Sequence, residues 1–371
     1  MKEKNLVEKK PEEASNFLKD NFFLLINCYK YQMRKLNILI AGSTGYIGIQ
    51  LIKLLIKHKY VKIKYLCGNN SAGKKISFFD KSLKSNKLPK ITKFNKKYLN
   101  DIDVIFTALP NGQAQEISKF LKKNNTLIDL AADFRLEKSS DYKKWYKQKH
   151  KAKNNINKSI YSLPEINGKN IKNKSIISCP GCYPTSVLLP LIPIIKERLI
   201  NTNNIIIDSK SGYSGAGRGV HKKYKDNNLY ESLSAYGVGY HRHNIEIQQM
   251  LEKYTNSVKF DFTPHLTPMF RGILSTIYVD LKKGVSQNKI INTLSKFYKN
   301  EIFIKILKKD KLLGTNDVIN TNYCYISICK SKNKNKLIIL SSIDNLIKGG
   351  AGQAVQNFNL KFKFPTKTGL T

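Results

Sequence analysis

The sequence feature that most constrains the fold is a glycine-rich segment between a buried apolar run and a helical one. The stretch "LNILIA" (36–41) is followed by "GSTGYIG" (42–48) and then by "IQLIKLLIKH" (49–58). This order is typical of a parallel strand that turns directly into a helix. Glycines at such a turn let a pyrophosphate approach the free N–H groups of the helix. We therefore predict a dinucleotide-binding domain that begins near Leu36.

Short apolar runs continue to alternate with helical ones downstream. We expect further strands at 61–67, 101–109 and 126–131, with a helix near 113–123. This alternation predicts a Rossmann-type parallel sheet, and so an α/β fold. After about residue 180 come longer strands with polar alternation, and "GGAGQAVQNFNLKF" (349–362) reads as a final helix. We therefore predict a second, α+β domain with a mostly antiparallel sheet.

The residues after the glycine turn favour NADP(H) over NAD as cofactor. NAD sites usually place an acid about 20 residues after the turn, where it binds the ribose hydroxyl. No acidic residue occurs between Leu36 and Phe79, and the segment after the second strand is "GNNSAGKK" (68–75). A 2′-phosphate would be repelled by an acid but accepted by hydroxyl and ammonium groups. The predicted cofactor-binding residues are Gly42, Ser43, Thr44, Gly45, Tyr46, Ile47, Gly48, Ser71 and Lys74.

The stretch "SCPGCYPT" (178–185) carries two cysteines at C-x-x-C spacing. A redox pair would need a thioredoxin-like order of elements, and a metal site would need a second ligand pair. The chain has no other C-x-x-C, so we predict no metal. Cys182 would lie at a helix start, where the helix dipole lowers a thiol pKa. We predict that Cys182 is a catalytic nucleophile and that Cys179 is a buried strand-end residue.

The net charge of +39 raises the question of nucleic-acid binding, but its composition argues otherwise. Only six of the 65 basic residues are arginines, and the lysines are spread along the whole chain. A nucleic-acid site would usually cluster its charges and use arginine. No apolar run approaches the roughly 20 residues of a membrane span. Acidic residues precede "FFLLI" (22–26), which argues against a signal or transit peptide. We expect a cytoplasmic protein.

Retained polar residues in glycine- and histidine-rich segments complete the predicted site. "YHRHN" offers His241 and His243 as acid/base groups, and an extended stretch would point both the same way. We prefer His243, with His241 in support, although the sequence does not decide between them. His265 is expected to be structural, and His58 and His150 to lie on the surface. The predicted substrate-binding residues, for carboxylate or phosphate, are Arg135, Ser211, Gly212, Arg218 and Arg242, with Arg271 in the same pool.

Together these segments give a specific resemblance. The runs "AGSTGYIG", "DLAADFR", "PGCYPT", "SGYSGAGR", "AYGVGYHRHNIEI", "FTPHLTPMFRGIL" and "DNLIKGGAGQAVQNFN" occur in order over residues 36–362. In this the chain resembles the N-acetyl-γ-glutamyl-phosphate reductase family, the arginine-pathway branch of the aspartate-semialdehyde dehydrogenase-like group. Two features depart from the family pattern. Ile245 stands where proline is usual, and the first 35 residues have no counterpart.

The resemblance implies reduction of N-acetyl-γ-glutamyl phosphate by NADPH through a thioester on Cys182. It also implies that Asn345, Lys348 and Gln353 contact the cofactor, and that the protein is a homodimer or homotetramer. The predicted domains are an extension (1–35), a nucleotide domain (36–181 with 345–371) and a catalytic and dimerisation domain (182–344). The close alternative is a related reductase that acts on an aspartyl or carrier-bound aminoadipyl phosphate. A remote alternative is a nucleic-acid-binding protein on a reductase scaffold.

Overall fold

The first half of the chain forms a parallel sheet, as the apolar runs predict. The computed structural model describes residues 34–218 and 231–370, so nearly all of the predicted N-terminal extension lies outside the described residues. Seven strands pair in the order β3-β2-β1-β4-β5-β7-β6, and every pairing is parallel. Their bounds are β1 Leu36–Ala41, β2 Val61–Cys67, β3 Ile91–Thr92, β4 Val104–Thr107, β5 Thr126–Asp129, β6 Ser159–Tyr161 and β7 Ile176–Ser178.

Burial explains why these runs become parallel strands. Ile38, Leu39 and Ile40 in β1 have no solvent exposure, so both faces of this strand are covered. Parallel sheets are normally covered on both faces, and their strands are therefore continuously apolar. The helices of this half are α2 Tyr46–Leu55, α3 Gln113–Ser118, α4 Ser139–Tyr146 and α5 Pro164–Asn167.

The second half forms a mixed sheet in which four of the six pairings are antiparallel. The strand order is β12-β13-β14-β11-β8-β10-β9, with parallel pairs only at β12–β13 and β8–β10. This confirms the predicted fold class. The bounds are β8 Ile200–Gly212, β9 Ser234–Ala235, β10 Phe260–Thr267, β11 Ile273–Leu281, β12 Ile304–Ile306, β13 Cys324–Lys330 and β14 Lys336–Ile343. The helices are α6 Cys182–Lys196, α8 His243–Leu251 and α9 Gln287–Phe297.

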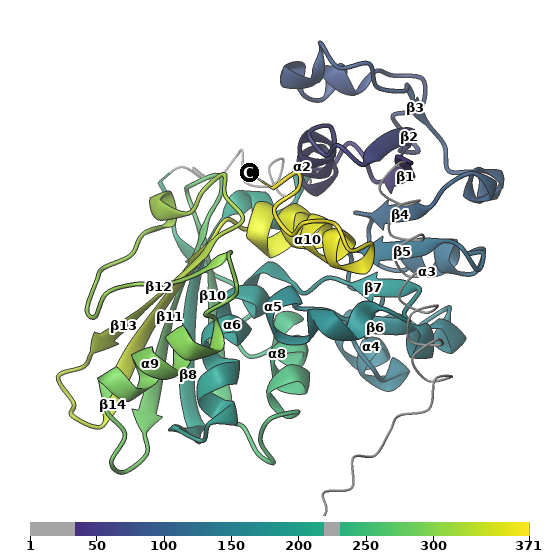
Figure 1. Ribbon diagram of the computed structural model, residues 1–371. Coiled ribbons are helices and arrows are strands. Elements are labelled where there is room, and N and C mark those ends of the chain that lie inside the picture. Colours follow the sequence, from purple (N-terminus) through teal and green to yellow (C-terminus); the bar gives the residue numbers. More distant parts are fainter. Residues whose placement is uncertain (1–33, 219–230, 371) are drawn as a thin grey trace, which may run out of the picture.

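Helix α6 lies against the second sheet, on the side toward the first half of the molecule (Figure 1). All its residues from Tyr183 to Ile195 are buried. A helix that is apolar on every side belongs in a core. It packs against α8, α9 and the strands β8, β11 and β14. The start of α6 is therefore held rigidly between the two halves of the molecule.

The chain returns to the first sheet at its C-terminus. A π-helical turn, η8 Ile347–Ala351, leads into α10 Gly352–Lys361, which packs against α2 (Figure 1). Val355 and Phe358 of α10 share one apolar cluster with Ile40 of β1. The exact domain boundaries stay a prediction. Among the described residues, no helix is long and apolar enough to cross a membrane.

The prediction that His58 and His150 lie on the surface was wrong. Both are buried, with exposed fractions of 2% and 5%. His58 Nε2 bonds to Asn359 Oδ1 at 2.8 Å, and His150 Nε2 bonds to the Asp133 carbonyl at 2.8 Å. The lysines around them in the sequence suggested exposure, whereas partners distant in the sequence cover them.

Candidate active site

Cys182 lies at the first position of α6, directly after a strand and a Pro-Gly turn. Gly181 is the N-cap residue, with extended φ/ψ of −65° and 158°, and no side chain caps this helix end. No acidic residue occurs in the first turn. The unpaired N–H groups of that turn therefore face the region of the thiol, where they favour negative charge. Cys179 is buried, and its sulfur accepts a long hydrogen bond from Asn357 Nδ2 at 3.7 Å.

Burial nevertheless keeps the Cys182 thiol neutral in the resting protein. Desolvation raises its pKa to about 11, although Arg135 and nearby backbone N–H groups act in the opposite direction. The expected lowering of this pKa was therefore wrong, because desolvation outweighs Arg135 and the backbone N–H groups. An attack by this sulfur would therefore require a base to take the thiol proton.

The His243 ring lies against the turn that precedes Cys182. The ring packs against Gly181, so closely that a Cβ there would lie 2.7 Å from Cε1 and 2.8 Å from Cδ2. Its Nδ1 is buried without a hydrogen-bond partner among the described residues. Burial, His241, Arg135 and Arg242 hold its pKa well below the usual value, so the ring is neutral and can accept a proton.

His241 supports His243 rather than duplicating it. The two rings lie 4.7 Å apart between centroids, and His241 Nδ1 accepts the backbone N–H of His243 at 3.1 Å. The segment is not extended as predicted. Arg242 has helical φ/ψ, and α8 begins at His243. The two histidines meet because His241 caps the start of α8.

Glu246 is a functional candidate that the sequence reasoning missed. It has no solvent exposure and lies one helical turn after His243. Its Oε2 accepts the N–H of Gly181 at 2.9 Å, and its Oε1 lies 3.8 Å from His243 Nε2. Glu246 therefore holds the backbone before Cys182 and faces the base. The H-x-x-E spacing on one helix face could have revealed it.

Arg135 is occupied by this same carboxylate. Its Nη1 donates to Glu246 Oε1 at 2.8 Å and its Nη2 to the Leu130 carbonyl at 2.9 Å. The side chain is 10% exposed. This geometry argues against the predicted contact between Arg135 and substrate, because the guanidinium already neutralises a buried acid. It assigns Arg135 to holding Glu246.

The glycine turn between β1 and α2 has the shape that a dinucleotide requires. Gly42 has φ +84°, and a Cβ there would lie 2.7 Å from the Ala108 carbonyl carbon. Gly45 is the N-cap of α2, without a capping side chain or an acid in the first turn. A cavity of about 740 Å³ opens beside the turn, with Gly42, Thr44, Gly45 and Ser71 in its lining. The free helix N–H groups and this cavity fit a pyrophosphate and its nucleosides.

The remaining predicted cofactor residues lie around this cavity rather than in its lining. Ser43 Oγ donates to the Cys67 carbonyl at 3.1 Å, and Gly48 packs on Ser43. Lys74 Nζ lies over the Phe78 ring at 4.7 Å. Tyr46 stacks edge-on against Phe270. Ile47 contacts the C-terminal turn through Gly350.

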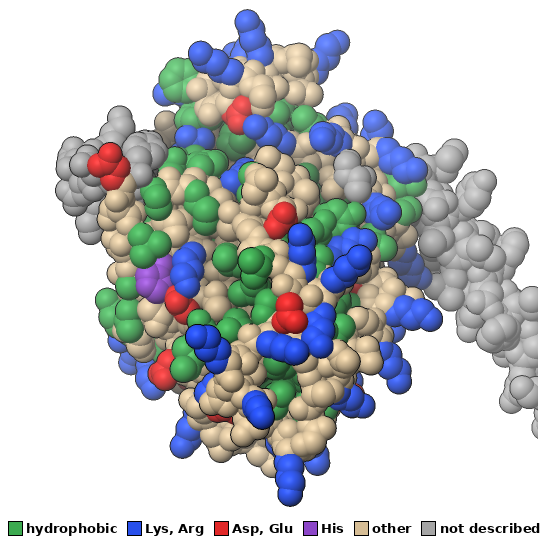
Figure 2. Space-filling model, turned by 90° about the vertical axis from the view of Figure 1, so that its left-hand side faces the viewer, with side chains coloured by type: hydrophobic (Ala, Val, Ile, Leu, Met, Phe, Trp, Pro, Cys, Tyr) green, Lys and Arg blue, Asp and Glu red, His purple; other side chains and the backbone are tan. Residues whose placement is uncertain are grey.

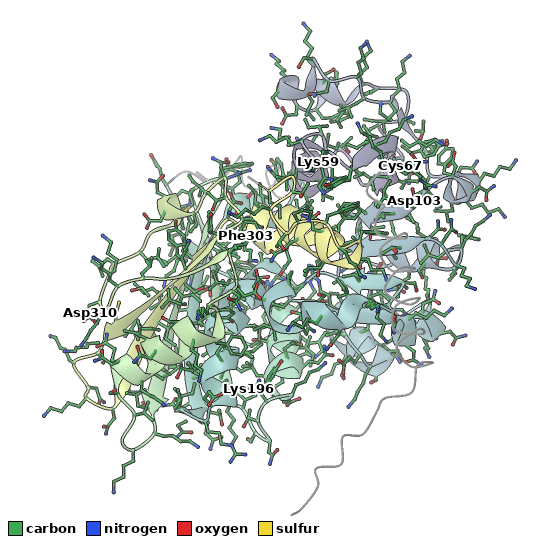
Figure 3. The ribbon with its side chains drawn as sticks, viewed as in Figure 1. Lys59, Cys67, Asp103, Lys196, Phe303 and Asp310 are labelled. Carbon is green, nitrogen blue, oxygen red and sulfur yellow. The ribbon has the colours of Figure 1, made fainter. Side chains whose placement is uncertain are left out.

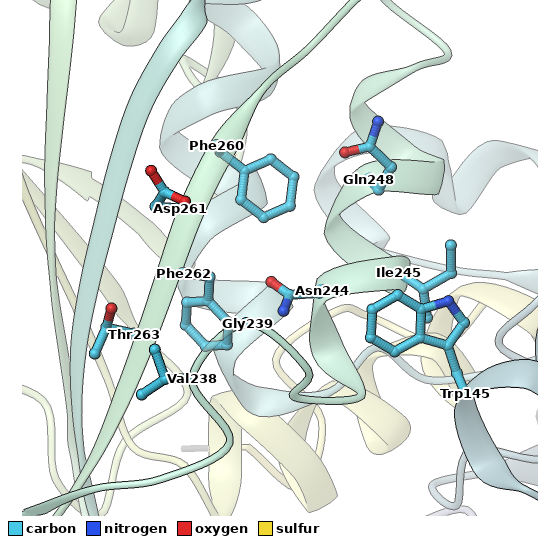
Figure 4. A pocket seen from close by; sticks show the side chains of 10 residues that line it. All are labelled: Trp145, Val238, Gly239, Asn244, Ile245, Gln248, Phe260, Asp261, Phe262 and Thr263. Carbon is cyan, nitrogen blue, oxygen red and sulfur yellow. The ribbon is translucent and has the colours of Figure 1, made fainter.

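A second cavity, of about 520 Å³, lies on another side of α8. Trp145, Asn244, Gln248 and strand residues 260–263 line it, and neither His241 nor His243 does (Figure 4). The predicted chemistry therefore has no group in this second cavity.

Comparisons with known proteins agree with this geometry. Residues 37–174 match the family model of the semialdehyde dehydrogenase NAD binding domain, and residues 182–345 match that of the semialdehyde dehydrogenase dimerisation domain. The N-acetyl-gamma-glutamyl-phosphate reductase of Thermoanaerobacter pseudethanolicus is 45% identical over 339 residues, which are 89% of this chain and 96% of that protein. The protein of the same name from Ehrlichia canis is 40% identical over 91% of this chain and 98% of its own length. The chain belongs to the N-acetyl-γ-glutamyl-phosphate reductase family.

Solved structures share the fold at low identity. The aspartate semialdehyde dehydrogenase II of Vibrio cholerae, complexed with ASA, has a TM-score of 0.65 at 15% identity and covers 89% of this chain and 99% of its own. The aspartate semialdehyde dehydrogenase of Candida albicans, solved with NADP, has a TM-score of 0.62 at 16% identity, over 88% of this chain and 98% of its own. Both have the two-domain architecture described above.

Several of the other predicted substrate-binding residues are held by contacts within the protein. The Gly212 N–H donates to the Gly272 carbonyl at 2.9 Å, so it is not free for an anion, and Ser211 Oγ donates to the Gly212 carbonyl at 3.1 Å. The predicted anion contact is wrong for the Gly212 N–H, because strand pairing uses it. Arg218 Nε donates to the Thr44 carbonyl at 2.9 Å and its guanidinium lies over the Tyr46 ring, at the cofactor turn. Arg242 is exposed and lies over the Tyr146 ring at 5.4 Å.

The three C-terminal residues that the resemblance places on the cofactor are buried. Asn345 Oδ1 accepts the Gly272 N–H at 2.7 Å, and Gln353 Nε2 donates to Thr185 Oγ1 at 3.1 Å. Lys348 has no solvent exposure and pairs with Glu165. None of the three lines the 740 Å³ cavity. The Gln353 bond holds α10 against the first turn of α6, whereas the bonds of Asn345 and Lys348 hold the C-terminal segment to Gly272 and to α5.

Proposed function

We propose that this chain reduces N-acetyl-γ-glutamyl phosphate to N-acetyl-L-glutamate 5-semialdehyde with NADPH and releases phosphate, as a step of arginine biosynthesis in the cytoplasm. One observation carries the proposal: Cys182 begins a helix whose preceding glycine packs against the neutral base His243. Membership in the reductase family supports the choice of substrate. The absence of acidic residues from 36 to 79 and the position of Ser71 in the cavity support NADPH.

The first half-reaction uses only residues of this chain. His243 accepts the thiol proton as the Cys182 sulfur bonds to the γ-carbonyl carbon. The bond from that carbon to the phosphate oxygen breaks, and phosphate leaves with the electron pair and the proton from His243. The free N–H groups at the start of α6 stabilise the transient oxyanion. A thioester remains on Cys182.

The second half-reaction reduces that thioester. NADPH, when bound, supplies a hydride. The thioester carbonyl carbon receives it, and the oxyanion again faces the start of α6. The carbonyl re-forms as the carbon–sulfur bond breaks, and the sulfur leaves with the bonding electrons. One proton from solvent restores the Cys182 thiol, and the aldehyde is released.

The reverse reaction tests this function directly. We expect the parent chain to reduce NADP⁺ with N-acetylglutamate semialdehyde only when phosphate is present. Cys182→Ala should lower this rate at least about 10³-fold, because the nucleophile is lost. Cys179→Ala is the matched control and should keep most activity, since burial raises the pKa of that thiol to about 12. Turnover without phosphate, or an active Cys182→Ala protein, would overturn the mechanism.

The same assay separates the alternatives. Aspartate semialdehyde or a carrier-bound aminoadipyl semialdehyde as the better substrate would favour the related reductases. A nucleic-acid-binding function would predict a localised basic surface. On the face drawn in Figure 2, lysines and arginines are scattered between other side chains, which favours the enzyme.

We also propose that the protein is a homo-oligomer that pairs through the second sheet. On β8, Ile206 is 42% exposed between the buried Ile205 and Ile207, and alternate residues of β11 are also partly exposed. We expect light scattering to give at least a dimer and Ile206→Lys to give smaller species. Ile56→Lys, at a residue 37% exposed beside α2, is the control and should keep the parent mass. A monomeric parent would contradict this proposal.

A further inference from the structure

Lys348 carries an ammonium group at a position with no solvent exposure. Its Nζ donates to Glu165 Oε1 and, at 2.9 Å, to Gln356 Oε1. Gln356 Nε2 donates to Glu165 Oε1 at 2.8 Å, and Asn322 Nδ2 donates to Gln356 Oε1 at 3.0 Å. These four residues are called the buried network below. Apolar side chains of similar volume would stabilise the fold as much as this buried ion pair or more. We therefore look for a role of the network other than stability.

The buried network joins segments that are far apart in the sequence. Glu165 comes from α5, Lys348 from η8, Gln356 from α10, and Asn322 precedes β13. The Lys348 Nζ also lies 5.8 Å from the ring of Phe303, which is labelled beside α10 in Figure 3. The ion pair therefore ties the end of the first sheet to the turn by which the chain returns from the second.

That turn touches both halves of the reaction centre. A Cβ on Gly349 would lie 2.6 Å from Cys182 Cβ, and one on Gly350 would lie 2.8 Å from Ile47 Cδ1. The turn η8 thus separates the start of α6, with its nucleophile, from the start of α2, with the cofactor turn. It is π-helical, a local form that is common at functional sites. The contacts that hold η8 in place therefore also set the distance between the thioester and the bound cofactor.

We propose that Glu165 and Lys348 are positioning residues for hydride transfer: their buried ion pair holds η8 as a spacer between Cys182 and the nucleotide turn. The inference rests on the proposed function. Hydride transfer requires reacting atoms about 3–3.5 Å apart, and a misplacement of 1 Å can cost about 10²-fold in rate. Thioester formation depends instead on Cys182, His243 and Glu246, which β7, α6 and α8 hold in place.

The test measures thioester formation and hydride transfer separately in a double variant that leaves no unpaired buried charge. In Glu165→Gln combined with Lys348→Met both charges disappear, and the new amide can still accept the Gln356 N–H. We expect a melting temperature near that of the parent, and NADPH affinity and Cys182 alkylation by iodoacetamide within about threefold. Phosphate released on mixing with N-acetyl-γ-glutamyl phosphate, without NADPH, should stay one equivalent per site. Single-turnover oxidation of NADPH by the acylated protein should slow by about 10–100-fold.

Two further variants sharpen the test. Glu165→Gln alone keeps an acceptor for Lys348 and should lie between parent and double variant in hydride-transfer rate. Gly168→Ala is the control: its new methyl meets only the end of the Leu360 side chain, at 2.7 Å, and parent rates are expected.

Each remaining outcome decides against the inference. A double variant with the parent's hydride-transfer rate would make the pair merely structural, and so would one that does not fold. Equal losses in alkylation, phosphate release and hydride transfer would mean general damage around Cys182. If the parent chain releases no phosphate from N-acetyl-γ-glutamyl phosphate, the proposed function itself is wrong. This result would be known before any variant is made.

Discussion

At the scale of single residues, burial determines how Cys182 and His243 are charged at rest. Desolvation raises the pKa of Cys182 to about 11 and lowers that of His243 well below its usual value. Both shifts favour the neutral forms, so the resting pair is thiol and imidazole rather than thiolate and imidazolium. In the mechanism proposed above, proton transfer then accompanies the attack on the substrate, and the leaving phosphate takes the proton onward.

This neutral pair predicts the pH dependence of Cys182 alkylation. Only the thiolate reacts, so the rate should rise about tenfold per pH unit from pH 7 to 10 and level off only near pH 11. Mass spectrometry of the Cys182 peptide after iodoacetamide treatment would measure it apart from the other cysteines. His243→Gln should leave the profile nearly unchanged, because the resting thiol has no imidazolium partner to lose. A plateau near pH 7, lost in His243→Gln, would instead reveal an ion pair.

At the scale of elements, the site is built from two strand–helix turns of the same kind. Gly45 starts α2 and Gly181 starts α6, both with extended φ/ψ and without a capping side chain. Each helix therefore has free N–H groups in its first turn, which the proposed mechanism uses for the cofactor phosphates at α2 and for the reacting carbonyl oxygen at α6. The turn η8 lies between them.

The crowding at the first of these turns predicts that alanine has a larger effect at Gly42 than at Gly284, a glycine outside the site. Gly42 and Gly284 both have positive φ, +84° and +78°, and alanine in this conformation costs about 1 kcal/mol. Only Gly42 is also crowded, against the Ala108 carbonyl, whereas Gly284 faces open space. Gly284→Ala should lower the free energy of unfolding by about that amount and leave NADPH affinity unchanged. Gly42→Ala should lower stability further and weaken NADPH binding at least about tenfold. Thermal unfolding and NADPH fluorescence titration would measure both, and equal effects would contradict the crowding argument.

Local sequence patterns predicted the strands and helices well, because the apolar periodicity of a segment depends mainly on how that segment itself is buried. The strand bounds 36–41 and 61–67 agree with β1 and β2, and α6 begins at Cys182 as the Pro-Gly turn suggested. The helix expected from residue 49 begins at Tyr46, and the one expected to reach 123 ends at Ser118. Helix ends depend on capping and packing, which a periodicity does not contain.

The site residues were predicted least well where their partners are distant in the sequence. The bond from Glu246 to the Gly181 N–H spans 65 positions, and the pair of Lys348 with Glu165 spans 183. A sequence read without alignment shows no such pairing. The resemblance therefore gave Lys348 as a cofactor contact, and nothing in the sequence pointed to its pairing with Glu165. The two-residue spacing of His241 and His243 likewise did not reveal that a helix begins between them.

At the scale of the whole molecule, buried histidines link folding to pH. His58, His150 and His241 share one arrangement: Nδ1 accepts the backbone N–H of the residue two positions later, at 3.3, 3.2 and 3.1 Å. A nitrogen that accepts an N–H carries no proton itself, so each ring is the neutral tautomer with hydrogen on Nε2. Burial lowers the pKa of all three, and of His243 as well.

These shifts predict that mild acid destabilises the fold. Below pH 6.5 the unfolded histidines bind protons, whereas the folded ones remain neutral down to about pH 4 in the case of His241. The unfolded state then binds more protons, so stability is full above pH 6.5 and is lost as the pH falls. Asp129 and Glu301 act in the opposite direction, since burial raises the pKa of both, that of Asp129 to about 7, but they are two groups against four. We expect the melting temperature to be lower at pH 5 than at pH 7.5.

His58→Gln should lower the melting temperature at pH 7.5 yet make its pH dependence shallower, because one titrating group is gone. A parent chain equally stable at both pH values would show that the four rings are protonated within the fold.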